Sequence, residues 1–90
     1  MNKVQIWLIH TSNCKDCEKA KRVLESAIKE SNISCKVIMV DCEDKIAVNI
    51  AITNDISSVP GCVIGNGVAT FQGENFPKED IVRAIKQASL

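Results

Sequence analysis

Two cysteines with one short spacing carry the clearest chemical signal in this sequence. Cys14 and Cys17 are separated only by Lys15 and Asp16. Residues three apart in a helical turn lie on one side of it, roughly 5–6 Å from each other. That separation suits the Cα distance that a disulfide requires. The two thiols could therefore close into a disulfide and open again with little movement of the backbone.

The position of this pair in the chain predicts different roles for the two sulfurs. A helix is expected to begin at Lys15, so Cys14 would lie where unpaired backbone N–H groups and the helix dipole stabilise a thiolate. Cys17, further into the helix, would be more covered, and it suits the thiol that resolves a mixed disulfide. Lys15 favours the anion and Asp16 opposes it. His10, at the end of the preceding strand, could tune the thiolate or carry a proton.

The elements that must position the pair follow from the spacing of apolar residues. The β-branched run at 4–9 predicts a central strand buried on both faces. Apolar residues at helical spacing from 20 to 28 predict a helix from Lys15 to Ser31–Asn32. A second strand is expected at 35–40. A strand, a helix and a strand in this order favour a parallel pair with a right-handed crossover.

The second half of the chain predicts a helix, a hairpin and a last helix. The segment 46–54 is expected to form a short helix, although its β-branched residues favour a strand. Two short apolar runs, 62–64 and 68–71, flank Gly65-Asn66-Gly67 and predict a hairpin. The last helix is expected from Pro77. The sequence thus predicts an α/β fold of order β-α-β-α-β-β-α, with a four-stranded mixed sheet and helices on both of its faces.

Composition narrows the class of protein. The length of 90 residues fits a single domain over 1–90, and 46% hydrophobic residues can supply its core. The 11 basic and 11 acidic residues cancel, and aromatic residues are few, so no nucleic-acid partner is expected. No apolar run is long enough to cross a bilayer, and the N-terminus does not resemble a secretory signal. We therefore expect a cytoplasmic protein with no membrane contact. We also expect it to be a monomer.

The other cysteines admit several interpretations. The number of cysteines, five, is odd, which argues against a secreted protein whose fold is stabilised by disulfides. Cys35 is expected to be a buried apolar residue of the second strand, and Cys42 lies among acidic residues after it. Cys62 is either a small apolar strand residue or a third thiol that acts with Cys14 and Cys17 in redox chemistry or metal binding.

Three features together resemble the thioredoxin/glutaredoxin family. These are the order of elements, the Cys14-Lys15-Asp16-Cys17 motif where the first strand ends, and Ser58-Val59-Pro60 before the third strand. The resemblance implies a thioredoxin-like fold. It also implies that Pro60 is a cis-proline packed against the disulfide, and that the Val59 backbone pairs with a bound peptide or with glutathione.

The function that this resemblance implies is that of a thiol–disulfide oxidoreductase. Cys14 and Cys17 would be its catalytic residues, and Val59 and Pro60 would bind the substrate. No cofactor beyond the redox-active disulfide, and no metal, would be required. The partners would be proteins with a disulfide, together with a flavoprotein reductase or glutathione as the reductant. The alternative is a soft-metal module, since two thiolates at this spacing also suit Cu(I) or Zn.

Overall fold

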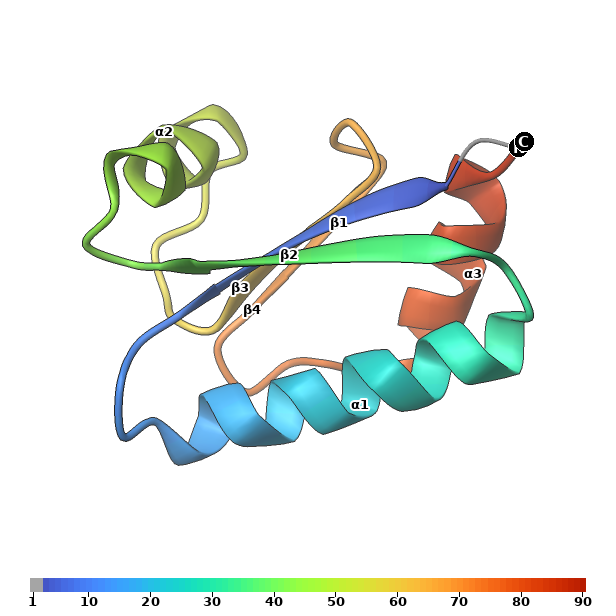
Figure 1. Ribbon diagram of the computed structural model, residues 1–90, viewed down its shortest axis with the longest axis horizontal. Helices are drawn as coiled ribbons and strands as arrows, with labels where there is room; N and C mark the ends of the chain where they lie inside the picture. The colour runs from blue at the N-terminus through green and yellow to red at the C-terminus, as the bar shows by residue number, and fades with distance from the viewer. Residues whose placement is uncertain (1–2) are drawn as a thin grey trace.

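The computed structural model describes residues 3–90, and its elements follow the predicted order (Figure 1). The strands are β1 (Val4–His10), β2 (Cys35–Asp41), β3 (Gly61–Ile64) and β4 (Ala69–Gln72). The helices are α1 (Lys15–Ser31), α2 (Lys45–Thr53) and α3 (Lys78–Ala88). The helix expected at 46–54, where the propensities conflicted, is therefore confirmed.

The four strands form one mixed sheet in the order β2-β1-β3-β4. β1 is parallel to β2, and it is antiparallel to β3, which in turn is antiparallel to β4. The parallel pair is the one that the strand–helix–strand pattern predicted. As a result, β1 is an interior strand, and the loop that follows it carries the chain from the middle of the sheet to Cys14.

Helices cover both faces of the sheet, as predicted. α1 and α3 lie together against one face, and α2 lies against the other (Figure 1). The larger core lies between the sheet and helices α1 and α3. Its fully buried members include Ile6, Leu8, Leu24, Ile64, Ile81 and Ile85. A smaller cluster around Ile9, Val40 and Ala47 seats α2. No helix among residues 3–90 is long and apolar enough to span a membrane.

The boundaries differ from the predicted ones in the hairpin and at the last helix. The second hairpin strand begins at Ala69 rather than at Val68, because the turn extends one residue beyond the predicted Gly65-Asn66-Gly67 segment. Gly65 and Gly67 both adopt positive φ angles, of 65° and 88°, and the Val68 N–H donates to the Ile64 carbonyl at 3.0 Å. Pro77 lies just before the first helical residue, as the N-cap of α3.

Candidate active site

Cys14 and Cys17 form a disulfide at the N-terminus of α1, with their Cα atoms 5.2 Å apart. This is the spacing that one helical turn provides. The backbone N–H of Cys17 also donates a hydrogen bond to Cys14 Sγ at 3.0 Å. When the disulfide is reduced, the same N–H is placed to stabilise a thiolate on Cys14.

The local backbone explains why the helix begins at this point. Asn13 has a left-handed conformation, with a φ of 55°, which asparagine tolerates better than most residues. Cys14 is then extended, and it acts as the N-cap of α1 through its sulfur. Cys14 is half-buried, whereas Cys17 is only 6% exposed and faces the core. The outer sulfur is thus the one that a partner can reach.

The Val59–Pro60 segment lies at the same end of the sheet. Ile9 pairs with Gly61, so Pro60 is level with the end of β1 that leads to Cys14. The Val59–Pro60 peptide bond is cis, as the resemblance implied. Pro60 is buried, and its carbonyl accepts a hydrogen bond from the Gly73 N–H at 2.8 Å. Val59 is partly exposed, and among residues 3–90 no backbone hydrogen bond uses its N–H or C=O.

A glutamine that the sequence reasoning missed holds this segment in place. The side-chain oxygen of Gln72, at the end of β4, accepts hydrogen bonds from the backbone N–H groups of Ser57 and Ser58 at 2.9 and 3.1 Å. No local motif marks Gln72. The only signal would have been its place at the end of a predicted strand, opposite the residue after Pro60.

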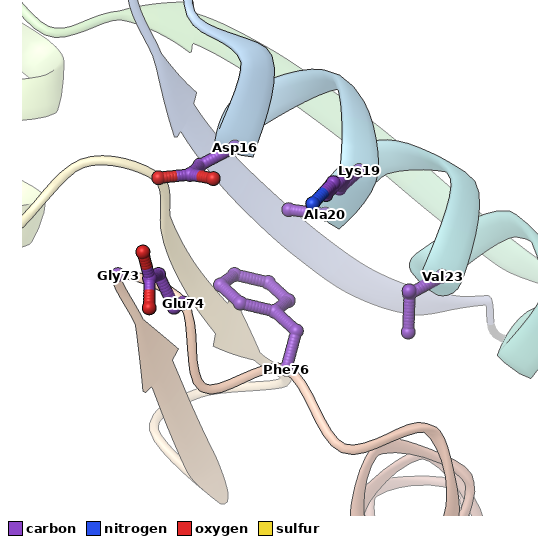
Figure 2. A pocket seen from close by; sticks show the side chains of 7 residues that line it. All are labelled: Asp16, Lys19, Ala20, Val23, Gly73, Glu74 and Phe76. Atoms are coloured by element: carbon purple, nitrogen blue, oxygen red, sulfur yellow. The ribbon is translucent and has the colours of Figure 1, made fainter.

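A pocket of about 380 Å³ opens between α1 and the loop after β4 (Figure 2). We call it the Phe76 pocket, and its lining residues are Asp16, Lys19, Ala20, Val23, Gly73, Glu74 and Phe76. Figure 2 shows the carboxylates of Asp16 and Glu74 at one end of the pocket and the Phe76 ring beside them. Asp16, one of the two predicted tuning residues between the cysteines, is half-buried there, while Lys15 is exposed.

Among residues 3–90, no hydrogen bond joins the side chain of any remaining candidate residue to the disulfide. His10 is half-buried at the end of β1, and its carbonyl accepts a hydrogen bond from the Cys42 N–H at 2.8 Å. Within residues 3–90, no hydrogen bond joins the His10 ring to Cys14 or Cys17. Cys62 is fully buried in the larger core, and burial raises the pKa of its thiol to about 12. Burial also raises the pKa of Cys35, which is half-buried beside the same core.

Across the described part of the chain, no group of three or more His, Cys, Asp or Glu side chains is placed to hold a metal ion. Among residues 3–90, Cys62 therefore does not join Cys14 and Cys17 in a three-cysteine metal site. Cys62 packs as an apolar strand residue instead, which was the simpler of its two interpretations.

Comparison with known proteins identifies the family. The family model for the thioredoxin domain matches residues 2–87. A search of curated proteins gave no match. Among solved structures, an uncharacterised thioredoxin-like protein from Clostridium perfringens has a TM-score of 0.75 at 21% identity, over 96% of this chain and 71% of that one.

Two named thioredoxins also share the fold. Mitochondrial thioredoxin 3 from Saccharomyces cerevisiae, in its oxidised form, has a TM-score of 0.66 at 18% identity, over 97% of this chain and 80% of its own. Thioredoxin 1 from Thermosipho africanus has a TM-score of 0.64 at 15% identity, over 92% of this chain and 91% of its own. With the fold and the disulfide-forming cysteine pair in agreement, the chain belongs to the thioredoxin family.

Proposed function

We propose that this protein is a thiol–disulfide oxidoreductase that reduces disulfides in partner proteins. The observation that carries the proposal is the disulfide between Cys14 and Cys17, formed across the first turn of α1. Only the outer cysteine is open to a partner, and a helix N-terminus stabilises its thiolate. These are the properties that a reversible dithiol requires.

The reaction transfers two electrons between sulfur atoms. The Cys14 thiolate attacks one sulfur of the partner disulfide, whose S–S bond breaks as a new mixed disulfide forms, and the departing sulfur takes up a proton. Cys17 then loses its proton and attacks Cys14 Sγ. The partner leaves as a dithiol, and Cys14 and Cys17 become the disulfide. A flavoprotein reductase or glutathione would return the two electrons.

Val59 and Pro60 are proposed to bind the partner during this reaction. An extended chain can pair with a backbone whose N–H and C=O are free, as peptides do at an exposed strand edge. Val59 offers both groups within the described structure, at the end of the sheet that carries Cys14. Lys15, Asp16 and His10 are proposed to tune the Cys14 thiolate by their charge. The proposed setting is the cytoplasm, which keeps thiols reduced.

The first test is a redox titration of metal-free protein, in which thiol trapping and mass spectrometry follow Cys14 and Cys17. We expect a reversible two-electron couple between roughly −120 and −270 mV, the range of known thiol–disulfide oxidoreductases. Insulin reduction with dithiothreitol should be catalysed by the native protein and lost in Cys14→Ser. The variant Cys17→Ser should instead accumulate a mixed disulfide through Cys14.

The matched control is Cys35→Ser, which removes a half-buried thiol remote in sequence from the pair. It should retain the couple and the activity. If Cys14→Ser reduced insulin as fast as the native protein, the proposal would be wrong. Failure to form the disulfide, combined with stoichiometric Cu(I) or Zn in the purified protein, would favour the soft-metal module.

A further inference from the structure

We propose that the Phe76 pocket binds a lysine or arginine side chain that neighbours the target disulfide in the partner protein. The proposal rests on the oxidoreductase function above, and it adds a chemical feature that the favoured substrates share. The pocket lies beside the reacting sulfurs because Asp16, which lines it, is the residue immediately before Cys17.

The lining of the pocket matches a side chain with an apolar stem and a cationic head. Ala20, Val23 and the half-buried ring of Phe76 give the pocket an apolar portion. The carboxylates of Asp16 and Glu74 lie at the same end of the pocket, Asp16 on α1 and Glu74 in the loop after β4 (Figure 2). Lysine and arginine place methylene groups along apolar surface while the charge stays in a polar setting, and an aromatic face adds to the attraction of a cation.

The charges of the pocket also favour a cation. Two carboxylates and one ammonium, that of Lys19, line it, so negative charge is in excess. The ion pairs found among residues 3–90 are Lys78–Glu30 and Arg83–Asp80, and neither involves the pocket. Asp16 and Glu74 are thus not neutralised by Lys19 in a direct pair. A basic side chain of the partner could therefore pair with the Asp16 and Glu74 carboxylates, whereas an acidic side chain would be repelled by them.

The test uses three short disulfide peptides that differ only at the residue beside the attacked cysteine, which is Lys, Gln or Glu. The kcat/KM of each is divided by its rate with dithiothreitol, an uncharged reductant, to remove intrinsic differences in disulfide reactivity. We expect the native protein to prefer the Lys peptide over the Glu peptide by about two- to fivefold at low salt, the effect of a partly exposed charge pair. The preference should shrink in 0.5 M NaCl, because salt screens such pairs.

Matched variants assign the preference to the pocket. Asp16→Asn/Glu74→Gln removes both pocket carboxylates, while Glu18→Gln/Glu79→Gln removes two exposed carboxylates from the first turns of α1 and α3. Both variants change the net charge by the same amount. The Lys-to-Glu ratio should fall to about one in the first variant and stay at the native value in the second. Glu74→Gln alone, which leaves the segment between the cysteines intact, should lower the ratio in part.

Three outcomes would overturn the inference. The first is equal normalised rates for the three peptides with the native protein. The second is an unchanged ratio in the pocket variant, and the third is an equal loss of the ratio in the control variant, which would mean that net charge alone sets the preference. Failure to reduce any of the peptides is different, because it would reject the oxidoreductase function itself.

Discussion

The side-chain oxygen of Gln72 accepts a hydrogen bond from the backbone N–H of Ser57 at 2.9 Å, although the two residues are 15 positions apart in the chain. The same oxygen accepts the Ser58 N–H at 3.1 Å and the Ser57 hydroxyl at 3.4 Å. One side chain at the end of β4 therefore fixes the loop that leads directly into Val59 and Pro60. The geometry of the proposed substrate-binding backbone depends on a strand that contributes no residue to the chemistry.

Replacing this glutamine should weaken substrate binding more than chemistry. In Gln72→Ala, the loop loses three hydrogen bonds, and because Ser57 and Ser58 are exposed, water replaces the lost partner. We expect the free energy of unfolding to fall by about 1 kcal/mol, and KM for a disulfide peptide to rise with a smaller change in kcat. Urea unfolding and steady-state kinetics would measure the two effects.

Two further variants control this prediction. Gln72→Glu keeps a side-chain oxygen that can accept the same N–H groups, so it should restore most of the lost affinity. Gln87→Ala removes an exposed glutamine of α3, and it should leave both stability and KM unchanged. Equal kinetics for native protein and Gln72→Ala would show that the loop holds its conformation without the Gln72 side chain.

The parts of the site that the sequence predicted are those set by short-range geometry. The Cys14–Cys17 pair lies within one helical turn, so its spacing predicted the disulfide, and its position at the start of a helix predicted that Cys17 is more buried than Cys14. The contact between Gln72 and Ser57 depends instead on the β3–β4 register, in which Gly61 faces Gln72. The Phe76 pocket likewise combines α1 with a loop remote in sequence. Neither could be predicted without the three-dimensional arrangement of the sheet.

Much of the fold was predictable because the apolar patterns of β1 and α1 are long and consistent, whereas the pattern of α2 was ambiguous and those of β3 and β4 are short. The predicted strand and helix bounds that were wrong lie next to turns, where the backbone φ and ψ angles decide at which residue an element begins. The hairpin strand starts one residue late because Gly65 and Gly67 both take positive φ angles, which extend the turn to Val68. An Asn-Gly step alone does not reveal that extension, since a two-residue turn has the same local signature.

A second prediction concerns the close approach of Ile56 to Gly61, the residue that follows Pro60. A Cβ added at Gly61 would lie 2.7 Å from Cγ2 of Ile56, a distance that real contacts do not allow. Gly61→Ala should therefore lower the free energy of unfolding by about 1–3 kcal/mol, the cost of overpacking a filled space. Urea unfolding would measure the loss, and peptide reduction would show whether the adjacent Pro60 has moved.

A double variant separates this clash from other effects of the alanine. Ile56→Ala removes the obstructing atom, so Gly61→Ala/Ile56→Ala should be less destabilised than the two single changes together. Ile52→Ala, at an isoleucine that is 75% exposed, should have little effect alone and should not rescue Gly61→Ala. Strict additivity of Gly61→Ala and Ile56→Ala would contradict the proposed contact.

The third prediction is a loss of stability at alkaline pH that originates from Cys62. Burial raises the pKa of this thiol to about 12, from 9.0 for a cysteine exposed to water. Below pH 9 the thiol is protonated in both the folded and the unfolded chain, so its contribution to stability is complete. Above pH 9 only the unfolded chain readily loses the proton. The free energy of unfolding should then fall by up to about 1.4 kcal/mol per pH unit as the pH rises toward 12.

The comparison of Cys62 with Cys62→Ala isolates this effect. Both should be made in a Cys14→Ser/Cys17→Ser background with a reductant present, so that the redox pair does not titrate. Because Cys35, whose pKa is also raised by burial, is common to both proteins, its contribution cancels in the difference. Urea unfolding between pH 8 and 10.5 should show a steeper decline for the protein that retains Cys62. Parallel declines would mean that the thiol is reached by hydroxide in the folded chain, and that the core around β3 is open to water.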